Sequence, residues 1–401
     1  MARAFMKGNE AVAEAVIRGG VDLFAGYPIT PSSEMLEYAS DHMSDIGAKF
    51  IQVESELAAS TMLSAAGLIG RRAFTTTAGP GLALMTENLS NMILSRVTAL
   101  FIVVQRAANN ITPEQADYNY ATKGFGHNGQ RGYVIAPSTV QEAVDLAYTA
   151  LDKGQELEVP VLFMMDGMLG QMEEPVDLPP YKESKRSATV VPPTGCAGRQ
   201  KIDSRSMPRP QSYTETMEDA LERARNQLFQ ENLRWVDEEV KYDEYMMDDA
   251  EYAIVSYGSS ARIMRDAVKI LRERGVKVGL FRPITLFPFP EKQIAAFKDR
   301  GIKGVLTVEM AIPPMLHYDV KMHLDRSIPC QFYNRCGGNT VDEYEAAEAM
   351  EKLIEEVRKY GGCAGGRHAD AGRWQHFLHL HRRLRLLRQD HGGHPVQCQE
   401  V

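Results

Sequence analysis

Short apolar segments alternate with helical patterns over residues 8 to 165, and this alternation constrains the fold more than any other feature of the chain. The apolar segments are residues 21–25, 49–53, 73–76, 99–104, 133–136 and 159–164. They have the length of buried strands, and amphipathic sequence such as residues 138–151 fills the intervals. Strands that alternate with helices are typical of a mostly parallel sheet covered on both faces. The sequence therefore predicts an α/β, doubly wound domain.

A second strand–helix series begins at Tyr252. Residues 252–258 are apolar, Ser259 and Ser260 are placed to cap a helix, and residues 276–281 and 307–309 have the character of strands. Between the two series, periodicity is lost from residue 182 to about 212, and a charged helical pattern follows. We predict a first domain over 1–181, a linker arm and helix over 182–250, a second α/β domain over 251–358, and a disordered tail over 359–401.

The tail differs in composition from the rest of the chain. Six of the ten histidines lie after Tyr360, at 368, 376, 379, 381, 391 and 394. Imidazoles at 376, 379 and 381 could suggest a metal site, but no carboxylate or cysteine is placed to complete it. We expect no metal site here and interpret the tail as disordered, with a shifted reading frame as one origin.

Bulk properties exclude several classes of protein. The net charge of −8 argues against a nucleic-acid surface, which needs a basic patch. No apolar run approaches the length of a membrane span, and the N-terminal residues lack a signal-peptide core, so we expect a cytoplasmic protein. The five cysteines, at 196, 330, 336, 363 and 398, lack the close spacing of zinc or iron–sulfur ligands and are expected to be reduced thiols.

Two polar segments follow apolar strands. Residues 26–33 read Gly-Tyr-Pro-Ile-Thr-Pro-Ser-Ser, and residues 52–56 read Gln-Val-Glu-Ser-Glu. Pro28 and Pro31 fix the backbone on both sides of Thr30. A hydroxyl and a carboxylate at strand ends could face one crevice and form a small-molecule site. The alternative is a proline turn and a solvated helix N-terminus.

Together with residues 6–11 (Met-Lys-Gly-Asn-Glu-Ala) and 76–81 (Thr-Thr-Ala-Gly-Pro-Gly), these segments resemble the alpha subunits of the 2-oxoacid:ferredoxin oxidoreductases. These thiamine diphosphate enzymes oxidatively decarboxylate 2-oxo acids to acyl-CoA. The resemblance extends from about residue 6 to about residue 358. It implies a pyrimidine-type thiamine diphosphate-binding domain followed by a domain like the transketolase C-terminal domain.

The resemblance also implies roles for single residues. Glu56 matches the acidic residue that bonds the aminopyrimidine ring of the cofactor, while Glu54 would cap or solvate the start of the helix. Thr30 matches a threonine that bonds substrate near the reactive ring; alternatively it satisfies its own turn. Arg106 matches the arginine that receives the substrate carboxylate; alternatively it forms a structural ion pair.

Three further residues are weaker candidates. His127 could contact substrate or coenzyme A, although a lone histidine among glycines is more often a hydrogen-bonding loop residue. Tyr27 and Pro28 are candidates for the cofactor side of the crevice. Met35 could line the same pocket, but apolar side chains at this spacing usually belong to the core.

The chain lacks the Gly-Asp-Gly signature and following asparagine pair that grip diphosphate and Mg²⁺. The nearest string, residues 165–168, has no first glycine, so Asp166 is expected only to end a strand near the crevice. The resemblance therefore implies a thiamine diphosphate site shared with a beta subunit, which holds the diphosphate and Mg²⁺. Iron–sulfur clusters would lie on partner subunits of gamma or delta type or on ferredoxin, with coenzyme A as acyl acceptor.

Residues 115–127, 166–172 and 282–288 resemble the branched-chain (3-methyl-2-oxobutanoate) members most. The loop after Arg106 departs from the family's glycine-rich pattern, so 2-oxoglutarate, pyruvate or an aromatic 2-oxo acid remains an alternative substrate. A non-catalytic subunit that organises a partner is a second alternative. A nicotinamide dehydrogenase is disfavoured, because no Gly-x-Gly-x-x-Gly opens the first helix.

Overall fold

The computed structural model describes residues 2–124, 129–182, 194–195, 203–204 and 208–360. His127 and the histidine-rich tail after Tyr360 lie outside the described residues. Residues up to Ile354 belong to one compact unit that holds both sheets, and Glu355 begins a second unit, of which the structure describes only the end of helix α12.

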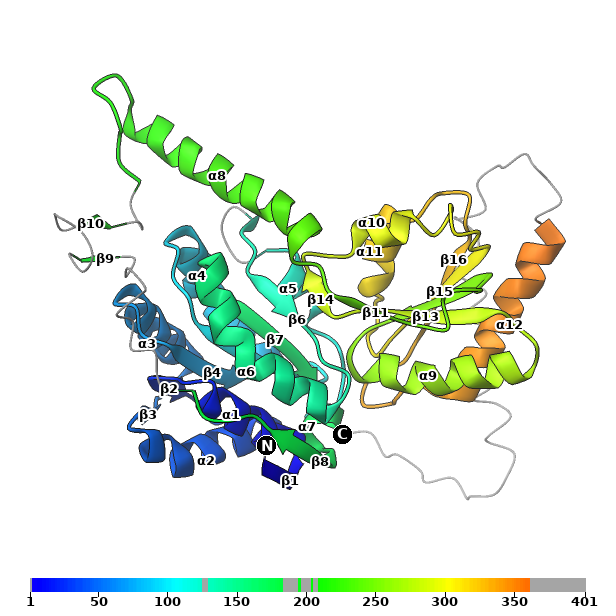
Figure 1. Cartoon of the computed structure of the whole chain (residues 1–401), viewed down its shortest axis with the longest axis horizontal. Helices are drawn as coiled ribbons and strands as arrows, with labels where there is room; N and C mark the ends of the chain where they lie inside the picture. Colours follow the sequence, from blue (N-terminus) through cyan, green and yellow to red (C-terminus); the bar gives the residue numbers. More distant parts are fainter. Residues whose placement is uncertain (1, 125–128, 183–193, 196–202, 205–207, 361–401) are drawn as a thin grey trace, which may run out of the picture. The chain divides into compact units, whose positions relative to one another are not determined.

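The first sheet has seven strands in the order β14-β6-β7-β5-β4-β2-β3 (Figure 1). Strands β2 to β7 are parallel, and β14 pairs antiparallel with β6 at one edge. The predicted alternation is thus confirmed, and β4, β5 and β7 are buried along their whole length. The strands are β2 (Leu23–Gly26), β3 (Lys49–Gln52), β4 (Ala73–Thr77), β5 (Leu100–Gln105), β6 (Tyr133–Ile135), β7 (Val161–Asp166) and β14 (Thr285–Phe287).

Helices follow each of these parallel strands. Helix α1 packs against α2 and α6, and α3 packs against α4. The first helix ends at a pair of glycines: Gly19 is the C-cap of α1, and Gly20 has a φ of 83°. The helices are α1 (Gly8–Arg18), α2 (Ser33–His42), α3 (Glu56–Leu68), α4 (Gly79–Leu94), α5 (Tyr118–Thr122), α6 (Val140–Leu157) and α7 (Gly167–Gln171). Strand β1 (Ala2–Lys7) comes just before α1, and β8 (Glu173–Leu178) comes just after α7; the two form a short antiparallel pair.

The second sheet has five strands in the order β11-β13-β12-β15-β16, and only β11 runs antiparallel to its neighbour. Its strands are β11 (Tyr242–Tyr245), β12 (Tyr252–Ser256), β13 (Val278–Pro283), β15 (Gly304–Glu309) and β16 (Cys330–Asn334). The helices of this part are α9 (Gly258–Glu273), α10 (Glu291–Ala295), α11 (Leu316–His323) and α12 (Glu343–Tyr360).

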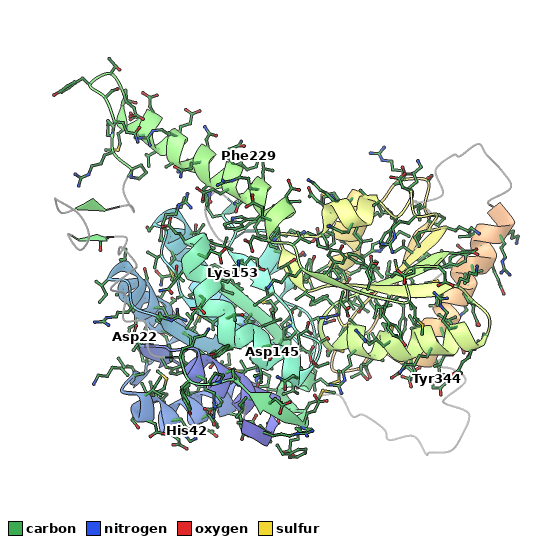
Figure 2. The ribbon with its side chains drawn as sticks, viewed as in Figure 1. Asp22, His42, Asp145, Lys153, Phe229 and Tyr344 are labelled. Atoms are coloured by element: carbon green, nitrogen blue, oxygen red, sulfur yellow. The ribbon has the colours of Figure 1, made fainter. Side chains whose placement is uncertain are left out.

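Both sheets take an edge strand from outside the expected domain limits. Strand β11 comes from the segment predicted as linker arm and helix, and β14 comes from the predicted second domain but pairs with the first sheet. The boundaries at 181, 250 and 358 remain predictions. The long helix of the linker segment is α8 (Met217–Glu238), which starts with a capping box formed by Thr216 and Asp219. Its Phe229 is exposed (Figure 2).

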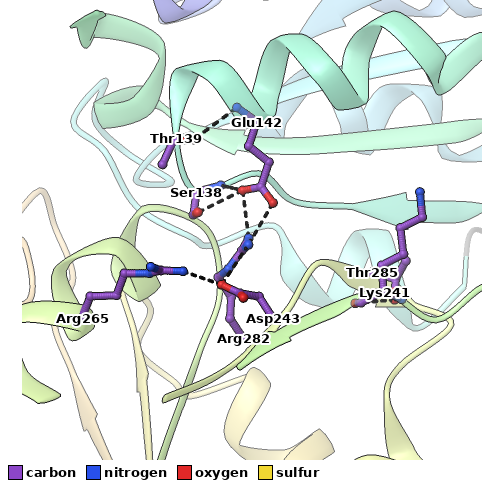
Figure 3. Close-up of polar contacts among 8 residues, drawn as sticks. All are labelled: Ser138, Thr139, Glu142, Lys241, Asp243, Arg265, Arg282 and Thr285. Carbon is purple, nitrogen blue, oxygen red and sulfur yellow. Dashed lines mark hydrogen bonds and ion pairs between the residues drawn. The ribbon is translucent and has the colours of Figure 1, made fainter. Parts of the chain in front are cut away.

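An ion-pair cluster joins helix α6 to the second sheet (Figure 3). The guanidinium of Arg282 on β13 donates to both carboxylate oxygens of Glu142 at 2.9 Å. Glu142 also accepts from the backbone N–H and hydroxyl of Ser138, and Asp243 bridges Arg282 and Arg265. Because Arg282 is buried, this bidentate pair with Glu142 holds helix α6 and strand β13 in a defined geometry.

The prediction that Ser259 and Ser260 cap a helix is wrong. Helix α9 already begins at Gly258, after Tyr257, so both serines lie inside its first turn. Their hydroxyls instead donate to partners from the first half of the chain: Ser259 to Asp166, and Ser260 to Gln115 Oε1 at 2.7 Å. The serines therefore join the two sheets rather than terminate a helix.

No helix in the described part of the chain combines the length and apolar character needed to cross a membrane. The two described cysteines, Cys330 and Cys336, are unpaired. Burial raises the pKa of the Cys330 thiol to about 12, which makes it inert as a nucleophile.

Candidate active site

The carboxyl ends of the parallel strands meet at one edge of the first sheet, and candidate residues or turns lie at four of these ends. Thr30 follows β2, the turn at residues 78–81 follows β4, Arg106 follows β5, and Asp166 ends β7. In open α/β sheets ligands bind in the crevice at this edge. The candidate site is therefore built from loops that the sheet holds in place.

Thr30 lies at the rim of a cavity of about 350 Å³. The threonine is exposed, and its hydroxyl has no hydrogen-bond partner among the described residues. The turn is satisfied instead by Ser32, whose Oγ donates to the carbonyl of Ile29 at 2.9 Å. The hydroxyl of Thr30 is thus available to a ligand. The lining residues are Thr30, Pro31, Ser33, Glu34, Ile111, Pro113, Gly167 and Gln171.

We call this cavity the Thr30 cavity. The carboxylate of Glu34, which is held in place by hydrogen bonds, forms its polar wall. Glu34 accepts from Lys7 Nζ at 2.8 Å, from Asn9 Nδ2 at 2.9 Å and from Gln171 Nε2 at 2.8 Å. Burial alone would raise the pKa of Glu34, but these hydrogen bonds outweigh it and lower the pKa. The carboxylate is therefore charged and held rigidly near neutral pH.

A tight backbone loop ties Arg106 to a residue that lines the Thr30 cavity. Arg106 forms a bridge with Pro113, and the N–H of Ala107 donates to the carbonyl of Thr112 at 2.9 Å. Pro113 in turn lines the cavity together with Thr30. Within the described residues Arg106 has no ion pair within 4 Å, and its buried Nε lacks a hydrogen-bond partner. A structural ion pair therefore does not explain this residue.

Glu56 is the first residue of helix α3 and lies beside the turn that follows β4. It is 6% exposed, and its carboxylate accepts no hydrogen bond from any described residue. A Cβ at Gly81 would lie 2.6 Å from Glu56 Cγ and 2.7 Å from its Oε1, so glycine at this position leaves room for the carboxyl group. The carboxylate oxygens keep some access to solvent, so this mostly enclosed group is free to bond a ligand.

Of the two roles predicted for Glu54, capping or solvating the helix start, the structure fits only the second. The N-cap of α3 is Ser55, whose Oγ accepts from the N–H of Ala58 at 3.2 Å. Glu54 is exposed and takes no part in the cap. Of the two carboxylates in this segment, only Glu56 is enclosed by the fold.

The other candidates fall into different environments. Tyr27 is 37% exposed and Pro28 is exposed, so both can reach a ligand or a partner; whether they contact cofactor stays a prediction. Met35 is fully buried in the core, as its spacing suggested. His127 lies outside the described residues.

Asp166 ends β7 as predicted and caps α7 by accepting from the N–H groups of Met168 and Leu169. Burial raises its pKa, although these bonds and the one from Ser259 oppose the rise. This carboxyl group is fully used inside the protein. It therefore offers no free ligand for a metal.

Sequence reasoning missed Asp117, the buried residue that begins helix α5. Burial raises its pKa to about 7; the negative charge of Glu114 adds to the rise, and the positive charge of Arg106 opposes it. Aspartate is an ordinary residue at a helix start, so the sequence contained no signal that this carboxyl group is buried beside Arg106.

Two family models match the chain. The pyruvate flavodoxin/ferredoxin oxidoreductase, thiamine diphosphate-binding model covers residues 14–241, and the pyruvate:ferredoxin oxidoreductase core domain II model covers residues 250–346. The chain belongs to the 2-oxoacid:ferredoxin oxidoreductase family. The family is one of enzymes, and the resemblance seen in the sequence is confirmed.

Ketoisovalerate oxidoreductase subunit VorB from Methanothermobacter thermautotrophicus is 37% identical over 365 residues, which are 90% of this chain and 99% of the relative. Family relatives of this kind are subunits of larger oxidoreductases. The prediction of a 2-oxoacid:ferredoxin oxidoreductase subunit is thereby confirmed.

Two solved structures share the fold. The 2-oxoglutarate:ferredoxin oxidoreductase from Magnetococcus marinus matches with a TM-score of 0.76 and 23% identity. The match covers 88% of this chain and 65% of the chain in that structure. A split gene transketolase matches with a TM-score of 0.56 and 12% identity, over 88% of this chain and 99% of that one. The predicted fold class is confirmed.

Proposed function

We propose that this chain is the alpha subunit of a CoA-acylating 2-oxoacid:ferredoxin oxidoreductase and supplies the pyrimidine side of a shared thiamine diphosphate site. The observation that carries the proposal is Glu56, a mostly buried residue beside Gly81 whose carboxylate bonds no described residue. Bound thiamine diphosphate supplies the electron sink for decarboxylation of the 2-oxo acid. In this proposal the carboxyl group of Glu56 bonds a nitrogen of the aminopyrimidine ring and holds its proton.

Substrate recognition is assigned to Thr30 and Arg106. The guanidinium of Arg106 offers a planar fork that suits a carboxylate, and no described residue occupies it with an ion pair. The free hydroxyl of Thr30 donates a hydrogen bond to the 2-oxo acid. The bridge between Arg106 and Pro113 supports this assignment, because it links the arginine to the wall of the Thr30 cavity.

The substrate we propose is a branched-chain 2-oxo acid, 3-methyl-2-oxobutanoate. The identity to a ketoisovalerate oxidoreductase subunit supports this choice. The lining of the Thr30 cavity supports it too: Pro31, Ile111 and Pro113 are apolar, and no lysine, arginine or histidine is among the lining residues. With Arg106 assigned to the first carboxylate, a second one, as in 2-oxoglutarate, would find no further cation among these lining residues.

A beta subunit that holds the diphosphate and Mg²⁺ is the partner we propose for the side of the molecule near Glu56. Exposed apolar side chains lie on the elements next to Glu56: Ile51 on the edge strand β3, Leu57, Met62 and Ile69 on or after α3, and Leu84 on α4. Exposed apolar side chains and an uncovered edge strand favour protein–protein contacts. Iron–sulfur clusters and ferredoxin binding are assigned to other subunits, and the complex is expected to be cytoplasmic.

The test is to purify the complex from its source through a tag on this chain and to identify the proteins that accompany it. Reduction of an electron acceptor is then followed with each 2-oxo acid in the presence of coenzyme A. We expect the highest kcat/KM with 3-methyl-2-oxobutanoate. A preference for 2-oxoglutarate, pyruvate or an aromatic acid would refute the substrate assignment. A complex that turns over none of them would favour an organising role.

The shared site has its own test. Titration calorimetry of the isolated chain with thiamine diphosphate and Mg²⁺ should show no tight binding, whereas the complex should retain the cofactor. Tight binding to the isolated chain would contradict a site divided between two subunits.

A further inference from the structure

Asn9 lies in the first turn of helix α1 and belongs to the segment 6–11, to which the proposed function gives no role. Its side chain is fully buried. The amide Nδ2 donates two hydrogen bonds, to the carbonyl of Pro31 at 2.8 Å and to Glu34 Oε2 at 2.9 Å. Both hydrogens of this amide are therefore used, and both bonds reach a segment that is distant in the sequence.

One of these bonds holds the turn that carries Thr30. Inside the turn, Ser32 bonds the carbonyl of Ile29 through both its Oγ and its backbone N–H, at 2.9 Å each. These bonds are local, so they shape the turn without tying it to the rest of the protein. Among the described residues, the bond from Asn9 is the only hydrogen bond that ties residues 28–32 to an element other than α2, which follows directly. The position of the Thr30 hydroxyl therefore depends on Asn9.

The other bond fixes the direction of the amide. Glu34 accepts from Lys7 Nζ and from Gln171 Nε2, at 2.8 Å each, as well as from Asn9. Lys7 ends β1 and Gln171 ends α7, so three elements converge on this carboxylate. Because the carboxylate accepts one hydrogen of the Asn9 amide, the other hydrogen is directed at the carbonyl of Pro31.

The Asn9 amide carries a cost that packing does not explain. Its Oδ1 is buried and has no hydrogen-bond partner among the described residues. A buried acceptor without a partner costs about 1–3 kcal/mol. An apolar side chain of similar size would not carry this cost, so the need for asparagine lies in the two bonds that Nδ2 donates.

Gly170 on α7 leaves the space that the amide occupies. A Cβ there would lie 2.5 Å from Asn9 Oδ1, 3.0 Å from its Cγ and 3.2 Å from its Nδ2, and these are the three nearest atoms. Gly170 has no positive φ, so its backbone does not require glycine. The missing side chain at this position therefore makes room for the Asn9 amide.

We propose that Asn9 is a positioning residue that, through the backbone of Pro31, holds the Thr30 hydroxyl where it meets the 2-oxo acid. This inference rests on the proposed function, in which Thr30 donates a hydrogen bond to that acid. Asn9 is not among the residues that line the Thr30 cavity. Its effect on the reaction must therefore pass through Thr30.

A double-mutant cycle on the assembled complex tests this dependence. Its readout is kcat/KM for the best 2-oxo acid of the panel, in wild type, Asn9→Leu, Thr30→Val and the double variant. We expect each single variant to lower kcat/KM by about tenfold or more. The double variant should lie within about twofold of Thr30→Val, because a misplaced hydroxyl and a missing one have the same consequence. Effects that multiply would overturn the inference.

Asn334→Leu is the matched control, because Asn334 has a similar setting at the end of β16. Its Nδ2 donates to the carbonyl of Ala311 at 2.6 Å, and its buried Oδ1 lacks a partner among the described residues, as at Asn9. Urea unfolding should show a loss of stability for both variants. Any loss of kcat/KM in Asn334→Leu should multiply with that of Thr30→Val. A control that is as non-additive as Asn9→Leu would overturn the inference.

Gly170→Ala keeps the test decisive if Asn9→Leu fails to assemble. Alanine is favoured over glycine within a helix, and the three atoms nearest to its Cβ would all belong to Asn9. We expect kcat/KM to fall by about threefold or more, and Thr30→Val to mask this fall in the double variant. A wild-type kcat/KM in Gly170→Ala would reject the proposed role of Asn9.

Thr30→Val separates this inference from the proposed function. If Thr30→Val leaves kcat/KM unchanged, Thr30 does not bond the substrate, and the proposed recognition fails. If Thr30→Val lowers kcat/KM but its effect multiplies with that of Asn9→Leu, only the role of Asn9 fails.

Discussion

Gly81→Ala tests whether space beside Glu56 is needed for catalysis. Gly81 has no positive φ, so its backbone does not require glycine. Its Cβ would lie 2.1 Å from Thr77 Oγ1 and 2.6 Å from Glu56 Cγ, so these atoms must retreat by roughly 1 Å to reach an ordinary contact. Such overpacking costs about 1–3 kcal/mol of stability. The higher helix propensity of alanine returns about 1 kcal/mol.

The loss of activity should be larger than the loss of stability. A 1 Å displacement of a catalytic group can lower the rate about 100-fold, so we expect kcat of the Gly81→Ala complex to fall by that order. The assay combines urea unfolding of the chain with turnover of the assembled complex at saturating 2-oxo acid.

Gly79→Ala is the matched control, because it lies two residues away in the same helix. Its Cβ would meet Asp117 Oδ1 at 2.3 Å, and the three nearest atoms all belong to Asp117 and not to Glu56. We expect a similar loss of stability, with kcat within about threefold of wild type. Wild-type kcat in Gly81→Ala, at the expected loss of stability, would refute the reasoning.

Three further predictions concern stability. Arg282→Met should lower the free energy of unfolding by roughly 2–4 kcal/mol, because Glu142 loses its bidentate partner. Urea unfolding measures this loss, and a value below about 1 kcal/mol would contradict the prediction. Gln115→Ala removes three buried bonds, to Ser260, Met310 and Tyr257, and should cost about 3 kcal/mol in the same assay, whereas an unchanged midpoint would contradict it. Burial lowers the pKa of His317 to about 4, so the folded state keeps this histidine neutral, and the free energy of unfolding should fall as the pH drops below about 6.5. His317→Gln should weaken this pH dependence, and a variant with the same pH profile as wild type would contradict the prediction.

Much of the fold could be predicted from the sequence because hydrophobic periodicity, and the residues that end helices and strands, act locally. The strand before Thr30, the glycine stop at Gly19 and the strand that ends at Asp166 all follow from such patterns. The edge strands β11 and β14 could not be placed, since pairing partners far apart in the chain decide them. The same applies to Ser259 and Ser260, whose bonds reach across the chain and override their capping preference.

The site was predictable in part. Resemblance gave Thr30, Glu56 and Arg106, but not the environment that makes each available. Burial of Glu56 depends on α4, and exposure of the Thr30 hydroxyl depends on Ser32 satisfying the turn in its place. The burial of Asp117 shows the limit most clearly, because it depends on neighbours such as Gly79 that are distant in the sequence.

The most direct test of the central claim compares Glu56→Gln with Glu54→Gln in the assembled complex. Release of CO₂ from carboxyl-labelled 2-oxo acid is measured, and circular dichroism and complex assembly report on the fold. We predict that Glu56→Gln lowers the rate at least about 100-fold with the fold intact, as expected for loss of a proton-transfer group. The exposed Glu54 should be replaceable with little effect. Near-normal CO₂ release from Glu56→Gln would contradict the account.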